Sequence, residues 1–98
     1  MFMVLVRMKI VVRIFGEISS IIGKRHEVEL PDSVTVGSLV NKIQEQTNQP
    51  KGYLGGFRIG SKDLSIILNG KSIELLAGLV TLLNDGDEVV IMQPTAGG

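Results

Sequence analysis

The sequence has no cysteine, no tryptophan and a single histidine, and its charges cancel. Without cysteine the chain cannot form a disulfide, a thiolate metal site or a cysteine nucleophile, and one histidine cannot build a multi-histidine metal site. Ten Lys and Arg residues balance ten Asp and Glu residues, which argues against a dedicated nucleic-acid binder because such proteins usually carry a basic excess. We therefore expect no metal and no bound cofactor, and a carrier or binding module rather than a self-sufficient enzyme.

The sequence also lacks an uninterrupted apolar segment. A membrane-spanning helix needs about 20 apolar residues with few charges, whereas Arg7, Lys9 and Arg13 interrupt the apolar N-terminus. A basic start and a small-residue cleavage site, which mark a signal peptide, are also missing, so we expect a cytoplasmic protein with no membrane partner. Residues 1–7 precede the first clean strand pattern and are either a short N-terminal extension or the result of a start codon placed too far upstream.

The composition suits one small domain. The chain has 98 residues, of which 44% are hydrophobic and 20% are charged, as in ordinary single-domain globular proteins. Apolar residues alternate over 9–15 and again over 25–30. This period of two predicts two strands, joined by a connection that turns at Gly23 and ended by Pro31.

One helix is predicted near the middle of the chain. Thr35 is a suitable N-cap because its hydroxyl can accept a hydrogen bond from a backbone N–H of the first turn. The apolar positions that follow share one helical face: Val36, Leu39, Val40 and Ile43. The pattern fades near 47–49, and Pro50 cannot continue a helix.

The second half is predicted to complete the sheet. Asn69-Gly70 is a strong signal for a two-residue hairpin. The expected elements are a loop at 51–63 with a short extended piece at 57–59, strands at 64–68 and 71–76, a turn at 85–87 and a last strand at 88–93. The predicted fold is therefore a two-layer α+β domain over residues 8–93, with the helix on one face of a mixed sheet of four or five strands.

The chain ends in Pro94-Thr95-Ala96-Gly97-Gly98, which we interpret as a flexible tail. Glycine lacks a Cβ, so its backbone can enter a narrow slot. The carboxylate at Gly98 becomes reactive only when it is activated, for example by ATP to an acyl-adenylate, and a partner enzyme must supply that step. A tail without function is the alternative, because glycine is common at mobile termini.

Four parts of the sequence carry a family resemblance: 9–16 with 21–24, 30–39, 68–73 and 85–98. They resemble the MoaD/ThiS sulfur-carrier family, whose fold is the ubiquitin-like β-grasp, and are most similar to the small subunit of molybdopterin synthase and its archaeal modifier-like relatives. The most specific part combines Asp-Gly-Asp-Glu-Val at 85–89 with Pro-x-x-Gly-Gly at 94–98. Many relatives approach the tail with an aromatic-Pro-Pro sequence, where this chain has Met92-Gln93-Pro94.

The resemblance implies a protein co-substrate rather than an enzyme. An activating enzyme related to the ubiquitin activators (the E1 enzymes) would use ATP to adenylate Gly98, which then becomes a thiocarboxylate. The large subunit of molybdopterin synthase would use that sulfur in molybdenum cofactor biosynthesis. Residues 94–97 would lie in the partner's tunnel. The resemblance also allows a ubiquitin-like modifier, joined through Gly98 to lysines of target proteins, and a plain interaction domain with an inert tail is a third hypothesis.

One sheet face is expected to stay open, because a single helix covers only the other face. Val11, Phe15, Val90 and Met92 share the outward parity, with Arg13 among them. If the first and last strands are neighbours, these side chains form an apolar patch suited to a partner, unless the N-terminal extension covers them or they are scattered surface residues. The family resemblance adds Leu76 to this predicted interface.

The remaining polar candidates are interpreted as structural. His26 has no co-ligand for a metal. Asp85, Asp87 and Glu88 are acidic enough for a cation site, but a turn before a solvated strand explains them better. The basic residues of the 51–63 loop are expected to be solvated.

Overall fold

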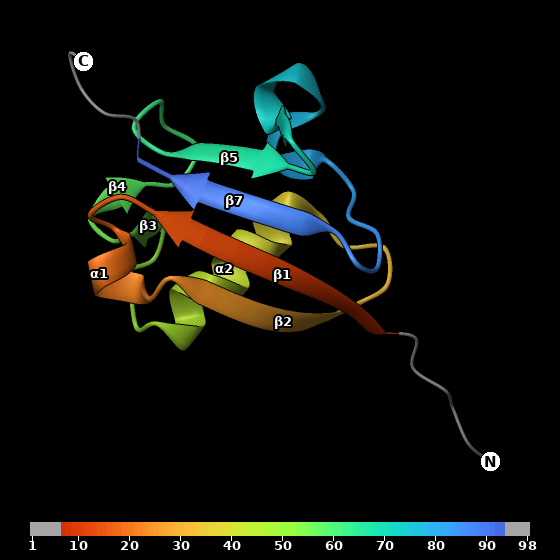
Figure 1. The fold of residues 1–98 in the computed structure, drawn as a ribbon, viewed down its shortest axis with the longest axis horizontal. Coiled ribbons are helices and arrows are strands. Elements are labelled where there is room, and N and C mark those ends of the chain that lie inside the picture. The colour runs from red at the N-terminus through yellow and green to blue at the C-terminus, as the bar shows by residue number, and fades with distance from the viewer. Residues whose placement is uncertain (1–6, 94–98) are drawn as a thin grey trace.

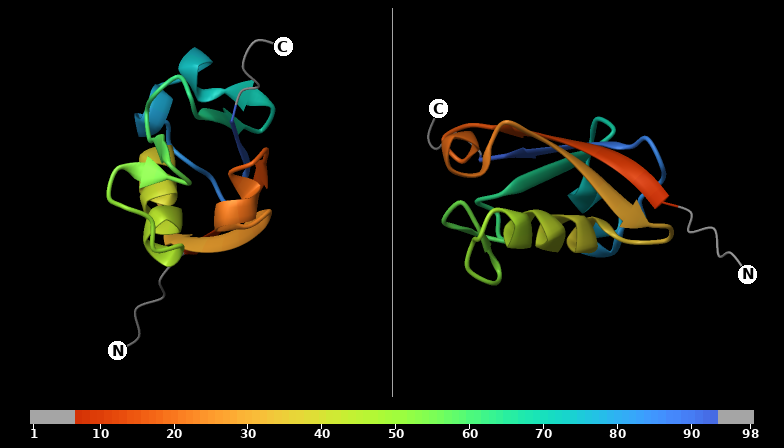
Figure 2. Two further views of the ribbon diagram at one scale, coloured as in Figure 1. Left: turned by 90° about the vertical axis from the view of Figure 1, so that its left-hand side faces the viewer. Right: turned by 90° about the horizontal axis from the view of Figure 1, so that it is seen from below.

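The computed structural model describes residues 7–93, which form two layers. One layer is a five-stranded sheet in the order β2-β1-β7-β5-β6. The other is the helix α2 (Val36–Gln46), which packs against one face of that sheet (Figures 1 and 2). This arrangement confirms the predicted α+β architecture with a single main helix.

The first two strands are β1 (Arg7–Phe15) and β2 (Arg25–Pro31), which pair antiparallel as predicted. Buried and exposed residues alternate along β1, so one side faces the core and the other faces away from α2. The connection is more ordered than predicted, because it contains the short helix α1 (Ser19–Ile22). Ile18 and Ile22 are buried at 0% and 3% exposure, and burying both from so short a segment requires a helical turn.

The last strand, β7 (Glu88–Met92), lies beside β1 and runs parallel to it. On its other side β7 pairs antiparallel with β5 (Ser65–Leu68). The N-terminal and C-terminal strands are therefore neighbours in the middle of the sheet, as the β-grasp order requires (Figure 1).

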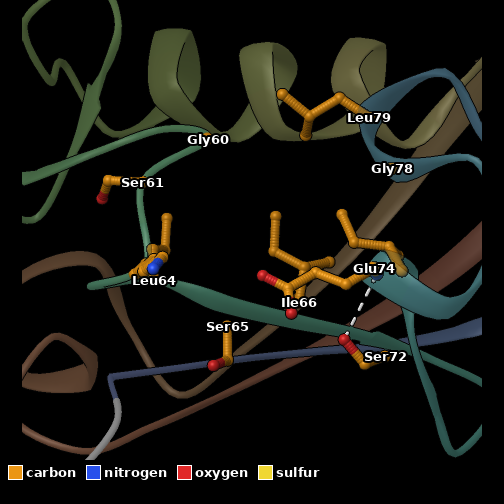
Figure 3. Close-up of a pocket in the computed structure, with 11 residues that line it drawn as sticks. Gly60, Ser61, Leu64, Ser65, Ile66, Ser72, Glu74, Gly78 and Leu79 are labelled. Carbon is orange, nitrogen blue, oxygen red and sulfur yellow. Dashed lines mark hydrogen bonds between the residues drawn. The ribbon is translucent and has the colours of Figure 1, made fainter.

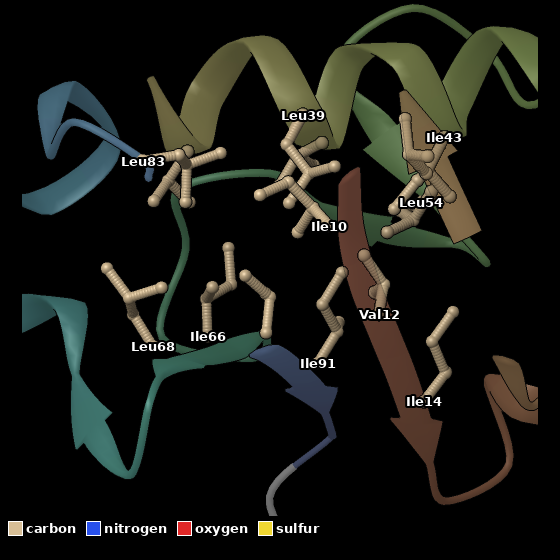
Figure 4. Close-up of a cluster of buried hydrophobic side chains, with 14 of the residues drawn as sticks. Ile10, Val12, Ile14, Leu39, Ile43, Leu54, Ile66, Leu68, Leu83 and Ile91 are labelled. Carbon is tan, nitrogen blue, oxygen red and sulfur yellow. The ribbon is translucent and has the colours of Figure 1, made fainter. Parts of the chain in front are cut away.

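The core lies between the sheet and α2 (Figure 4). Thr35 caps the helix as predicted, because its Oγ1 accepts a hydrogen bond from Ser38 N at 3.2 Å. The central core side chains are at most 2% exposed: Met8, Ile10, Val12, Ile14, Val36, Leu39, Val40, Ile43, Val89 and Ile91. Burying a side chain of this size stabilises the fold by about 1.5–3 kcal/mol, so these positions dominate the folding free energy.

The predicted loop over 51–63 contains a small hairpin of its own. Strands β3 (Tyr53–Leu54) and β4 (Phe57–Arg58) pair antiparallel around Gly55-Gly56. Leu54 is completely buried and belongs to the core. The predicted extended piece at 57–59 corresponds to β4, whereas the surface-loop prediction missed β3 and the burial of Leu54.

The strand predicted at 71–76 is much shorter. The pair β5–β6 turns at Asn69-Gly70 as predicted, but β6 is only Lys71–Ser72. Two 3-10 turns follow, η1 (Ile73–Leu75) and η2 (Gly78–Val80). The Ser72 hydroxyl accepts a hydrogen bond from Glu74 N at 3.3 Å, and this cap redirects the chain so that Ile73 enters the core.

The acidic turn before β7 holds three strands together. Asp87 Oδ1 accepts a hydrogen bond from Asn69 Nδ2 at 2.9 Å, and its Oδ2 accepts one from Asn84 N at 2.7 Å. Asp85 Oδ1 accepts one from Lys9 N at 2.8 Å. These contacts link the turn to β1 and to the β5–β6 hairpin, and they confirm the structural interpretation of both aspartates.

Replacing Asp87 by alanine is expected to destabilise the fold by about 2–3 kcal/mol, because a nearly buried carboxylate with two hydrogen-bond donors is lost and the donors stay unpaired. Asp85→Ala is the matched control, since Asp85 is exposed. Urea unfolding of both variants checks the prediction, and equal losses would contradict it.

Gly55→Ala is expected to destabilise the fold by about 2–4 kcal/mol, because a Cβ overpacks the core and strains the left-handed backbone. That Cβ would lie 2.4 Å from Ile18 Cγ1, at a φ of +59°. Gly56→Ala isolates the strain, since its φ is +88° and nothing lies within 4 Å. Thermal unfolding should show a clearly larger loss for Gly55→Ala, and similar losses would count against the packing argument.

Candidate functional site

The parallel pairing of β1 and β7 determines where the chain leaves the sheet. Phe15 lies opposite Met92 in the last pair of the register. Just beyond it, a Cβ at Gly16 would lie 3.6 Å from Gln93 Cβ, so the two backbones run close together. We call this corner, formed by Phe15, Gly16, Met92 and Gln93, the tail root. The tail residues Pro94, Thr95, Ala96, Gly97 and Gly98 follow it and lie outside the described residues.

Gln93, the last residue of the tail root, has a side-chain oxygen that lacks a hydrogen-bond partner among the described residues. Its Oε1 atom is buried and accepts no hydrogen bond from any residue in the 7–93 range. An unsatisfied buried oxygen costs about 1–3 kcal/mol. The departure of this sequence from the aromatic-Pro-Pro pattern therefore has a physical consequence at the point where the tail begins.

The outward face of the sheet carries the predicted apolar residues together. Val11 and Phe15 lie on β1, Val90 and Met92 lie on β7, and none faces α2. Phe15 is 50% exposed and the other three are half-buried. Of the described residues, none forms a layer over this face (Figure 2), so the predicted neighbours do lie side by side.

The structure adds Ile67 to this outward apolar surface and places Leu76 apart from it. Ile67 on β5 lies opposite Val90 and shares its outward face. Ser65, two positions earlier, was a signal for this orientation, because residues two apart in a strand share one face. Ile66 and Leu68 point inward. We define the outer patch as Val11, Phe15, Ile67, Val90 and Met92. Leu76, 41% exposed, follows η1 beyond the edge strand β6, so β5 and β6 separate it from β7.

A separate cavity of about 310 Å³ lies on the helix-facing side of β5 (Figure 3). Its lining includes three serines, but two of their hydroxyls have structural roles. Ser61 Oγ donates to Arg58 O at 2.7 Å, and Ser72 caps η1. Glu74 supplies the one carboxylate of this lining, and no hydrogen bond joins that carboxylate to a serine hydroxyl of the cavity. It offers packing space rather than a catalytic pair.

The other candidates also have structural roles or lie in solvent. His26 Nε2 donates to Ile22 O at 2.5 Å and so joins α1 to β2. Lys51, Arg58 and Lys62 are exposed, as predicted. Within residues 7–93, no three His, Cys, Asp or Glu side chains are grouped closely enough to hold a metal ion. No helix in this range is long and apolar enough to span a membrane.

Comparison with known proteins matches this geometry to one family. The model of the ThiS family matches residues 12–98 of the chain. A curated relative, Small archaeal modifier protein 3 of Haloferax volcanii, is 26% identical over 92 residues, covering 93% of this chain and 100% of the relative. The match therefore includes both the domain and the tail.

Solved structures agree on the fold. The HVO 2177 protein of Haloferax volcanii superposes with a TM-score of 0.72 at 25% identity, covering 94% of this chain and 88% of its own. A candidate molybdopterin converting factor, subunit 1, from Pyrococcus furiosus gives a TM-score of 0.69 at 24% identity, covering 90% and 99%. From the family match over nearly its whole length, the chain belongs to the ThiS family of ubiquitin-like β-grasp proteins, which are non-catalytic sulfur carriers or small modifiers.

Proposed function

We propose that this protein is a sulfur carrier whose C-terminal Gly98 is adenylated and converted to a thiocarboxylate for molybdenum cofactor biosynthesis. The observation that carries the proposal is the position of the tail root at the corner of the outer patch, with a Gly-Gly ending five residues beyond Gln93. A protein that binds the patch has the tail directly within its reach.

The chemistry belongs to the partners. The Gly98 carboxylate attacks the α-phosphate of ATP and displaces pyrophosphate. A hydrosulfide then attacks the carbonyl carbon of the acyl-adenylate, and the C–O bond to AMP breaks, which leaves the thiocarboxylate and AMP. The activating enzyme, of the E1-like type, supplies the ATP site. The large subunit of molybdopterin synthase consumes the sulfur. This chain has no cysteine, which suits a carrier whose sulfur is bound to a backbone carbonyl carbon.

The outer patch supplies the docking surface in this proposal. Its five apolar side chains extend over three adjacent strands, and contiguous exposed apolar patches mark interaction sites. Phe15 is the best candidate for an anchor, because it is aromatic, half-exposed and next to the tail root. Leu76 is proposed as an outlying contact of the same partner.

Conjugation is the second candidate function. The full-length curated relative is named a small archaeal modifier protein, and this favours an isopeptide bond between Gly98 and lysines of target proteins. Both functions require the same first step, because an unactivated carboxylate does not acylate an amine. They differ in the nucleophile that attacks the acyl-adenylate, which is a sulfur species in the first function and a lysine amine in the second.

The intact mass of the protein isolated from its native cells is expected to show a form in which one oxygen of Gly98 is exchanged for sulfur. A blot of the same lysate should show no ladder of heavier conjugates. A strain that lacks Gly98 is the control. A ladder that disappears in that strain would select the modifier function instead, and unmodified protein without a ladder, under conditions where a known relative is loaded, would reject both.

Phe15→Asp and Val90→Asp are each expected to weaken binding to the activating enzyme at least tenfold, or about 1.4 kcal/mol, because a charge replaces an apolar contact in the interface. Leu82→Asp is the matched control, since Leu82 is 60% exposed, lies outside the outer patch and is bridged to Thr35 at the N-cap of α2. Calorimetric titration measures the affinities, and circular dichroism checks that each variant is folded. Equal weakening by all three variants would reject the patch as the docking surface.

A further inference from the structure

Three cations gather at the corner of the sheet where the tail leaves. Arg13 on β1 lies directly opposite Arg25 on β2, and both point away from α2. Lys24 immediately precedes Arg25 and is exposed. Like charges directly opposite each other in an antiparallel pair are destabilising, so this arrangement works against the fold.

The same pair of strands does not repeat this conflict elsewhere. Two positions before Arg13 along the same face, Val11 faces Glu27, and further on Lys9 faces Glu29, a pair of opposite charges. The unfavourable Arg13–Arg25 pair is therefore local. Rules of local stability are broken most often where a function requires it, which makes this corner a candidate binding site.

Nearby carboxylates relieve the repulsion without removing it. Arg13 Nε lies 3.4 Å from Glu88 Oε2, and Arg25 Nη1 lies 3.7 Å from Glu27 Oε2. All four side chains are about half exposed, and such exposed pairs contribute little. Lys24 has no carboxylate within 4.0 Å among residues 7–93. Lys24 is thus available to a carboxylate of another molecule, and Arg13 and Arg25 can exchange their weak exposed pairs for one.

A hollow of about 430 Å³ lies between these cations and the tail root. Phe15 supplies its apolar side chain, while Arg13, Lys24 and Arg25 form its charged rim. Ile14 and Gly16 border it as well, but the Ile14 side chain points into the core. We call it the cationic hollow. Phe15 also belongs to the outer patch, so the hollow continues the proposed docking surface toward the tail.

We propose that the cationic hollow receives an acidic loop of the enzyme that activates the tail, with one apolar side chain against Phe15 and flanking carboxylates on Arg13, Lys24 and Arg25. This inference rests on the proposed function. Arginine binds carboxylates through two parallel hydrogen bonds, and complementary charge accelerates and orients protein association. Because the chain has no net charge, the electrostatic attraction of the partner has to come from Arg13, Lys24 and Arg25.

Arg25→Glu tests the inference, because it reverses one charge and places a carboxylate opposite Arg13. We expect a higher melting temperature together with weaker recognition. In ATP–pyrophosphate exchange by the ubiquitin-activator-related enzyme of the same genome, KM for the chain should rise at least tenfold while kcat stays unchanged. The KM of the variant should also lose most of its dependence on salt. Arg7→Glu is the control, since Arg7 lies at the opposite end of β1 against Pro31, and its KM should stay within twofold.

An unchanged KM for Arg25→Glu overturns the inference while leaving the proposed function intact. No exchange with the wild-type chain rejects the proposed function instead. In that case an NMR titration of the wild type with a capped Glu-Asp-Phe-Glu-Asp peptide decides the inference. Shifts confined to residues 13–25 that vanish in Arg25→Glu support it. No shifts, or binding of an oligonucleotide rather than the peptide at these residues, overturn it.

Discussion

The parallel pairing of β1 with β7 is the contact on which the rest of the structure depends. It joins strands from the two ends of the chain, so every other element lies between them in the sequence or beside them in the sheet. Parallel neighbours cannot be joined by a tight turn, and the intervening residues supply α2 as the covering layer. The same pairing brings Phe15 beside Met92 and so fixes the point from which the C-terminal residues depart.

The pairing of β1 with β7 is held by hydrogen bonds of the acidic turn at one end, and its other end leads to the tail root. At the start of β7, Gly86 N donates to Lys9 O at 3.0 Å and Val11 N donates to Asp87 O at 3.2 Å, so the acidic turn holds the register. At the far end the strands carry exposed apolar and cationic side chains. The repulsion between Arg13 and Arg25 also lies toward this far end, between β1 and β2.

Much of this could be predicted from the sequence, because strong local signals determine it. Alternation in β1 and β2, the Thr35 cap, the Asn69-Gly70 turn and the outward parity of Val11, Phe15, Val90 and Met92 each follow from short-range rules. The hairpin around Gly55-Gly56 could not be predicted, since its strands have two residues each and Leu54 is fixed by a tertiary contact. The early end of β6 could not be predicted either, because the Ser72 cap replaces the strand there. The outward direction of Ile67 was accessible from the sequence, because Ser65 shares its parity in the strand. The opposition of Arg13 and Arg25 depends on cross-strand register, which composition does not specify.

The Asp-Gly-Asp turn and the tail root lie at opposite ends of β7. The Asp-Gly-Asp turn organises the fold through Asp85 and Asp87, whereas Gln93, the last described residue, makes none of the hydrogen bonds that hold that turn. The part of the chain that stabilises the fold is therefore separate from the part to which we assign the proposed chemistry. A descendant that kept the turn and lost the two glycines would retain the fold and lose the proposed sulfur chemistry. A different C-terminal sequence could equally follow Gln93 without a change in the domain. Evolution could therefore change the C-terminal sequence while the domain that presents it stays the same.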